Sequence, residues 1–394
     1  MTDTSAQKSG SGLSPRGKDP LESAQLSGDE DGVRDSVALA SQSQLVWWSF
    51  KKHRVALVCG IISVAIYAIA ILAPFLAPYP ASAHNNEYTY APPQSIHLFH
   101  EGSFRPHVNG YTFEQDPDTL ALTFEVDTEQ VVPIGLFVQG AEYEILGFIP
   151  WDRHLIGPTD YEGTPMYLLG ADANGRDLLS RIIHGTTISM SVGLIGVLLS
   201  LFLGILLGGI SGYLGGKVDT AIQRLIEFII AIPTIPLWMA LFAAVPSSWS
   251  PVHRYLALTV VISLVGWVGM AREVRGKFFA VRNEEYVSAA IADGASQSRV
   301  MFRHMLPSFT SHIIANLSLS IPTIILAETA LSFIGLGLQP PTVSWGVLLQ
   351  EAQNIRAVST APWILLPGVA VVITVLAMNF FGDGLRDAAD PYKN

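Results

Sequence analysis

Long apolar runs constrain the fold of this chain more than any other feature. Of its 394 residues, 49% are hydrophobic and 14% are charged, whereas a typical soluble domain has about 25% charged residues. A transmembrane helix needs about 20 predominantly apolar residues to cross the ~30 Å hydrocarbon core of a bilayer. Runs of that length lie at 55–77, 187–212, 222–245, 255–273, 310–338 and 362–382. They predict an all-α polytopic membrane protein with six transmembrane helices.

The basic residues predict the orientation of these helices, because cytoplasmic loops carry an excess of Lys and Arg. A basic cluster at 51–54 precedes the first run. The segment between the fourth and fifth runs carries Arg272, Arg275, Lys277, Arg282, Arg299 and Arg303. The much longer loop at 78–186 has only four Arg and no Lys. We expect both termini and the basic segment in the cytoplasm, and the long loop outside.

The first run has an alternative interpretation as a signal peptide, since Ala81-Ser82-Ala83 looks like a cleavage site. The run has about 23 residues and begins far from the N-terminus, whereas the apolar region of a signal peptide has about 7–15 residues. We therefore expect a retained membrane helix. The third run is the least regular, because Pro233 and Pro236 interrupt helical hydrogen bonding.

Composition divides the rest of the chain. Residues 1–44 are rich in Ser, Gly and acidic residues and predict a disordered tail. Residues 45–85 hold the first membrane helix, 86–165 form an external insertion, and 166–394 form a core with five membrane helices. Strand-like runs at 118–126 and 142–148 predict that the insertion is β-rich.

Metal binding and disulfide formation find little support in the sequence. The histidines of the long loop, His84, His97, His100 and His107, have a spacing that fits no standard metal site and are expected to be solvated. The single cysteine, Cys59, lies in the first apolar run and is interpreted as a packing residue.

A polar segment at 284–307 interrupts the apolar runs. Residues 286–292 predict a short helix with small side chains, Gly294 resembles a helix C-cap, and Ser296 is a candidate N-cap for a second short helix. Pro307 is placed to start the next membrane helix. The simplest alternative is an ordinary amphipathic helix on the membrane surface.

The spacing in this segment resembles the EAA loop of bacterial ABC import permeases, which runs Glu-Ala-Ala, three residues, Gly, nine residues, Ile, one residue and Leu-Pro. Ser288 stands in place of the Glu and His304 in place of the Ile, while the other positions match. The resemblance implies that this loop couples the permease to an ATPase subunit. The implied coupling residues are Glu285, Ser288, Ala289, Ala290, Gly294, Arg303, Leu306 and Pro307.

Three further segments, at 169–185, 327–346 and 381–391, are similar to the dipeptide/oligopeptide/nickel permease family, with Ala171 where that family usually has Thr. The resemblance covers about 45–85 and 166–394. It implies the six-helix type I ABC importer permease fold and location in the bacterial inner membrane. It also implies a second permease as heterodimer partner, two cytoplasmic ATP-binding subunits and an external solute-binding protein. The solute class stays open among peptides, nickel, opines and oligosaccharides.

Two acidic residues within the predicted spans are candidate pore or gating groups, because a carboxylate in a membrane usually faces a cavity or a partner. Glu328 lies well inside the fifth span, and Glu227 lies near an end of the third. For Glu328 the alternative is a structural hydrogen bond to a neighbouring helix.

No catalytic motif is present in the sequence. Gly216-Lys217 and Gly276-Lys277 both lack the upstream Gly and the following Ser or Thr of a P-loop. We therefore expect no enzyme activity, no cofactor or metal bound by this chain, and no nucleic acid partner; ATP and Mg²⁺ would bind the partner subunits. The alternative from another class is a membrane-anchored binding or assembly protein that works through the external insertion.

Overall fold

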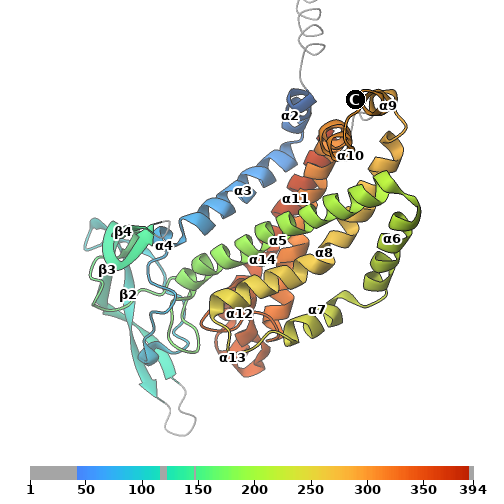
Figure 1. The fold of residues 1–394 in the computed structure, drawn as a ribbon. Helices are drawn as coiled ribbons and strands as arrows, with labels where there is room; N and C mark the ends of the chain where they lie inside the picture. The colour runs from blue at the N-terminus through green and yellow to red at the C-terminus, as the bar shows by residue number, and fades with distance from the viewer. Residues whose placement is uncertain (1–41, 116–121, 146–147, 390–394) are drawn as a thin grey trace, which may run out of the picture. The chain divides into compact units, whose positions relative to one another are not determined.

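The computed structural model describes residues 42–115, 122–145 and 148–389, and contacts divide the chain into residues 1–49 and 50–394. Of the predicted tail at 1–44, residues 1–41 lie outside the described residues, and residues 42–44 belong to helix α2. The helices are α2 (Gln42–Lys52), α3 (Arg54–Ile71), α4 (Ala73–Leu76), α5 (Leu178–Leu214), α6 (Gly216–Ile230), α7 (Thr234–Ala243), α8 (Pro251–Val281), α9 (Glu285–Ala292), α10 (Gln297–Arg299), α11 (Thr310–Phe333), α12 (Trp345–Gln350), α13 (Ile355–Thr360) and α14 (Leu366–Ala389). The strands are β1 (His97–His100), β2 (Ser103–Gln115), β3 (Leu122–Ile145) and β4 (Ile149–Pro158) (Figure 1).

Within the described residues, five helices are long and apolar enough to cross a membrane: α3, α5, α8, most of α11, and α14 with the turn before it. The remaining predicted span, 222–245, is broken. Helices α6 and α7 meet at an angle of 91° at the short link that contains Pro233. The predicted number of six spans therefore holds when this bent pair is counted as one span. Proline causes the break because it lacks the N–H that continues the helical ladder.

The membrane helices pack through small residues. Helix α5 lies against α8, α11 and α3, and α14 lies against α3 and α11. At the α5–α8 contact, Gly204, Gly208 and Gly212 recur every fourth residue and so share one face of α5. A Cβ atom at Gly208 would lie 2.4 Å from the carbonyl oxygen of Ala271. Glycine is therefore required for the close approach of these two backbones, as in other membrane helix pairs.

The insertion between α4 and α5 contains a four-stranded antiparallel sheet in the order β1-β2-β3-β4. Strand β3 has 24 residues. Its first half pairs with β2 and its second half with β4. The prediction of two separate short strands was wrong in this respect, because residues 122–126 and 142–145 of the two runs belong to the same strand, β3. The residues between them stay extended because each half of β3 has its own pairing partner.

Helices α9 and α10 lie between α8 and α11, as the sequence predicted for residues 284–307. Val300–Met305 form a turn of π-helix and Leu306–Phe309 a 3-10 turn. The next membrane helix, α11, begins at Thr310. Pro307 therefore lies in the turn before this helix and does not start it.

Candidate functional site

The segment 284–307 has one face buried and one face exposed. Val287 and Ala290 of α9 are buried, whereas Tyr286 and Ile291 are 42% and 51% exposed. Ser288 and Ala289 are also exposed. Two large side chains of α9 therefore stay accessible on the surface.

Gly294 separates the two short helices. Its φ of +77° lies in the left-handed region, which glycine adopts without the steric cost that a Cβ atom brings. A Cβ atom at this position would meet no atom within 4 Å. The requirement for glycine therefore comes from the backbone conformation and not from crowding. The Ser296 side chain accepts a hydrogen bond from the Arg299 N–H at 3.4 Å, as expected for the predicted N-cap.

The remaining predicted coupling residues lie around these two helices. Glu285, Arg303 and Pro307 are exposed, and Leu306 packs partly against the core beneath the segment. That core joins the segment to the membrane helices. Val300, Met301 and Met305 pack with Val274 and Phe278 of α8 and with Ile313 of α11.

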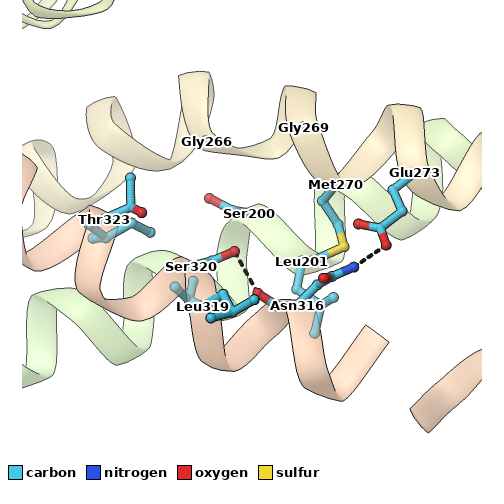
Figure 2. Close-up of a pocket in the computed structure, with 12 residues that line it drawn as sticks. Ser200, Leu201, Gly266, Gly269, Met270, Glu273, Asn316, Leu319, Ser320 and Thr323 are labelled. Atoms are coloured by element: carbon cyan, nitrogen blue, oxygen red, sulfur yellow. Dashed lines mark hydrogen bonds between the residues drawn. The ribbon is translucent and has the colours of Figure 1, made fainter. Parts of the chain in front are cut away.

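A cavity of about 260 Å³ lies between α5, α8 and α11 (Figure 2). Its polar lining consists of Glu273 on α8, Ser200 on α5, and Asn316, Ser320 and Thr323 on α11. The Asn316 side-chain amide donates a hydrogen bond to the Glu273 carboxylate, and His312 Nε2 lies 3.9 Å from the same carboxylate. Carboxylate and amide groups are costly within a membrane helix unless they face a cavity or each other.

Sequence reasoning missed this group of residues, although a weak signal was present. Asn316, Ser320 and Thr323 are spaced by four and three residues, which places them on one face of a helix. Gly266, Gly269 and Glu273 repeat the pattern on α8. A Cβ atom at Gly269 would meet no atom within 4 Å, so this glycine borders open space.

Glu328 does not line this cavity. Its side chain is fully buried and accepts hydrogen bonds from three hydroxyl groups, Ser344 at 2.7 Å, Ser332 at 2.8 Å and Ser189 at 3.1 Å. These three serines come from the loop before α12, from α11 and from α5. The arrangement of Glu328 with Ser189, Ser332 and Ser344, here called the hydroxyl cage, joins three separate parts of the chain.

Glu227 lies apart from both the cavity and the hydroxyl cage. It is on the exposed surface of α6, where its carboxylate accepts a hydrogen bond from Arg224 at 2.7 Å. Their side chains are 60% and 77% exposed. An exposed pair of this kind contributes little to stability in water.

Comparison with known proteins identifies the family. The sequence model of one protein family, described as the binding-protein-dependent transport system inner membrane component, matches residues 204–393. A second family model, the N-terminal TM domain of oligopeptide transport permease C, matches residues 41–93. The oligopeptide transport system permease protein OppC of Haemophilus influenzae is 37% identical over 245 residues, which cover 61% of this chain and 74% of the relative. This chain belongs to the family of binding-protein-dependent transport permeases.

Two other relatives match this permease with similar identity and coverage. The dipeptide transport system permease protein DppC of Haemophilus influenzae is 40% identical over 239 residues, 60% of this chain and 78% of the relative. The glutathione transport system permease protein GsiD of Pectobacterium atrosepticum is 36% identical over 250 residues, 63% of this chain and 79% of the relative. The aligned residues are a larger share of each relative, so this permease is the longer protein in each pair.

The family membership places the permease in the inner membrane as a multi-pass component of a binding-protein-dependent transport system, and not as an enzyme. The segment at 169–185, which resembles the same family in sequence, is held together by ion pairs. Asp172 is 1% exposed and pairs with Arg176 at 2.7 Å and with Arg181. Glu351, from the turn after α12, accepts a hydrogen bond from the Ala173 N–H at 2.8 Å. The motif therefore fixes the start of α5 to the turn after α12.

Asp177 of the same motif caps the N-terminus of α5. Its carboxylate accepts hydrogen bonds from the N–H and the hydroxyl of Ser180, at 2.8 and 2.5 Å. Burial raises the pKa of Asp177 from 3.8 to about 6, and the bonds from Ser180 only partly oppose this. Burial also raises the pKa of Glu351, with the charge of Asp172 as a second cause.

Proposed function

We propose that this permease imports peptides as one half of a heterodimeric pore, driven by two cytoplasmic ATP-binding subunits and supplied by an external solute-binding protein. The relatives with 36–40% identity are permeases for oligopeptides, dipeptides and glutathione, which supports a peptide substrate over nickel, opines or oligosaccharides. ATP and Mg²⁺ belong to the partner subunits in this proposal. Both termini of the permease lie in the cytoplasm, together with residues 284–307.

The exposed face of α9 and α10 is the observation that carries the coupling role. Tyr286 and Ile291 of α9, and Phe302 of the π-helical turn after α10, are each more than 40% exposed. Between them, Ser288 and Ala289 offer small side chains. A groove on an ATP-binding subunit can approach such a helix closely and cover its apolar side chains, as in other helix-in-groove contacts.

A packed route connects this face to the cavity. Met270 belongs to the core under the segment and also lines the cavity, and Leu201 does the same from α5. Because closely packed interiors transmit displacement and do not absorb it, a movement of α9 must shift the walls of the cavity. ATP-driven movement of the partner subunit would reach the pathway in this way.

The cavity between α5, α8 and α11 is the proposed part of the translocation pathway in this permease. The Glu273 carboxylate and the Asn316 amide supply an acceptor for a peptide ammonium group and a partner for a peptide carbonyl group. Serine and threonine hydroxyls line the rest of the polar wall. Weak, exchangeable hydrogen bonds of this kind suit a pathway through which a solute must also leave.

The test is reconstitution of the four-subunit transporter in proteoliposomes with its binding protein. ATP-dependent uptake of a labelled di- or oligopeptide is expected. Ile291→Glu should remove the ATP-binding subunits on affinity purification of the permease, because it places a charge in the proposed contact. Ile355→Glu is the matched control, since Ile355 is 84% exposed on α13, which lies between α11 and α14 and outside the segment 284–307. Retention of both ATP-binding subunits by Ile291→Glu would contradict the coupling role, and absence of peptide uptake by the intact transporter would contradict the substrate class.

A further inference from the structure

The second half of β3 and β4 form a hairpin with two chemically different faces. Tyr143 of β3 stands directly opposite Trp151 of β4 in the register, so the two rings share one face. Glu144 follows Tyr143 in the regular part of the ladder, opposite Pro150, and so points to the other face. The Gln139 amide donates a hydrogen bond to Asp152, the neighbour of Trp151, at 2.8 Å. The hairpin therefore has an aromatic face and a polar, acidic face.

The hairpin is attached to the end of the first membrane span. The ring centroids of Phe137 and Phe75 of α4 lie 5.9 Å apart. His154 of β4 lies within hydrogen-bonding distance of the carbonyl oxygens of Ala77 and Ala141, at 2.7 and 3.1 Å. These contacts hold the hairpin beside α4, which follows α3 directly (Figure 1).

An apolar groove lies between the hairpin and the helix end. It has a volume of about 320 Å³ and is lined by Ile71, Leu72, Phe75, Phe137, Tyr143 and Trp151, together with one proline. Ile71 is 63% exposed, Phe137 is 60% exposed and Trp151 is 46% exposed. Phe148 at the tip of the hairpin is 70% exposed.

We propose that this hairpin is a membrane-surface anchor whose aromatic face lies in the leaflet reached by the C-terminal end of α3, with a phospholipid acyl chain in the groove. The groove is continuous with the lipid-facing surface of a membrane span, because Ile71 is both the last residue of α3 and part of the groove wall. Tryptophan and tyrosine are enriched at the level of the lipid headgroups, where an apolar ring with a polar edge is favoured.

Charge favours lipid over a protein partner in this groove. Its described lining contains no ionised side chain that could fix a protein in register. The acidic residue Glu144 points to the opposite face, away from the negatively charged phosphate groups of the lipids. Arg153 lies two residues after Trp151 and so shares its face. The Tyr143 hydroxyl donates to the Arg153 carbonyl oxygen at 2.6 Å, and the Arg153 guanidinium donates to the Phe137 carbonyl oxygen at 3.2 Å. These two bonds pair polar groups that the face would carry into the interface.

The experiment uses the whole transporter in lipid nanodiscs, with cysteine-free partner subunits. Cys59 is the only cysteine of the permease, so Cys59→Ser provides the background. Trp151→Cys and Phe137→Cys carry an environment-sensitive fluorophore on the aromatic face, and Glu144→Cys carries it on the acidic face as the matched control. Nitroxide-labelled phospholipid is the probe from the membrane, and iodide is the probe from water.

The two aromatic-face labels should be quenched by the nitroxide lipid about twofold or more above the Glu144→Cys label, because an interfacial element is buried ~5–10 Å into the leaflet. Iodide should give the opposite order. Two results would overturn the proposal. Equal iodide quenching on both faces would show that the hairpin stands in water. Protection from both probes, lost when the second permease is left out, would show that a protein partner covers the groove.

Discussion

At the scale of single residues, burial decides what each acidic group can do. Glu328 and Glu273 both lie in membrane helices, yet Glu328 is enclosed by three serine hydroxyls while Glu273 lines a cavity. Because the carboxylate of Glu328 is already paired within the chain, we propose a structural role for it. The proposed pathway group is Glu273.

Substitution of Glu328 separates the two roles. Glu328→Gln keeps a carbonyl acceptor for the hydroxyl cage and should leave both complex abundance and peptide uptake per complex close to wild type. Glu328→Leu leaves the serine hydroxyls without their acceptor, which lowers the free energy of unfolding by about 1–3 kcal/mol for each buried unpaired group. The abundance of the assembled transporter should therefore fall in Glu328→Leu. A Glu328→Gln variant with normal abundance but slow uptake would instead place this residue in the pathway.

Asp177 predicts a pH dependence of stability. Its pKa is about 6 in the folded protein and 3.8 ordinarily, so the folded state binds the proton more tightly than the unfolded state. The free energy of unfolding from this group is therefore greatest below pH ~4, falls between pH ~4 and ~6, and is level above. Thermal unfolding of the purified transporter should show this slope. Asp177→Asn should flatten it, while Asp293→Asn, on an exposed site of the segment 284–307, should leave it unchanged.

At the scale of elements, α9 and α10 act as one unit because their connection has a defined backbone conformation. The left-handed φ at Gly294 turns the chain so that Val287 and Val300 reach the same core. Each helix alone is too short to be stable in water, since isolated helices below about 12–15 residues are marginal. Packing against α8 and α11 therefore gives the segment its shape.

Gly294→Val should uncouple ATP hydrolysis from uptake. A β-branched residue is a strong outlier at positive φ, so the two helices should change their mutual angle and lose their fit to the ATP-binding subunit. Gly294→Asn is the matched control, because asparagine tolerates the left-handed region. Membrane insertion should be normal for both variants. Peptide uptake per ATP should fall for valine and be largely kept for asparagine, and normal coupling in an assembled Gly294→Val transporter would contradict this explanation.

At the scale of the whole molecule, the four-stranded sheet is attached to the permease core and is not a free-standing domain. Tyr111 of β2 is 5% exposed and packs with Tyr88, Tyr167 and Ala171 near the entrance of α5. The main chain of Tyr167 also accepts a hydrogen bond from the N–H of Gln94 at 3.0 Å. The sheet therefore relies on residues from both sides of the insertion, as expected for a core too small to be stable alone.

We propose that the exposed carboxylates of the sheet receive the solute-binding protein. Glu114, Glu125 and Glu129 are all exposed on β2 and β3. Reversing these charges to Lys should weaken binding of the solute-binding protein, and the loss should shrink at high salt because the Debye length shortens from about 10 Å at 0.1 M ionic strength. Affinity and stimulated ATPase activity at two salt concentrations are the measurements. Replacing 90–160 by a Gly/Ser linker is a harsher test, since it also removes Tyr111 from its core. Equal affinity for the charge-reversed and wild-type permeases would exclude this docking role.

The sequence alone determined the membrane class, the approximate positions of the spans, and the short helices at 284–307. Hydropathy and turn residues are signals local to a short stretch of sequence. A run of about twenty apolar residues, or a Gly at a helix end, can therefore be recognised without knowing which residues pack against it in the fold. The same signals correctly singled out Pro233 as a weak point, where α6 and α7 bend by 91°.

Only the tertiary structure decided which polar groups meet. Ser200, Glu273 and Asn316 come from three helices and share a cavity, while Glu328 finds its partners on α5, on α11 and in the loop before α12. In the same way, the aromatic face of the β3–β4 hairpin forms a groove only together with the helix end beside it. The physical reason is that the free energy of burying a polar group or exposing an apolar group depends on its surroundings. Those surroundings come from residues far away in the chain.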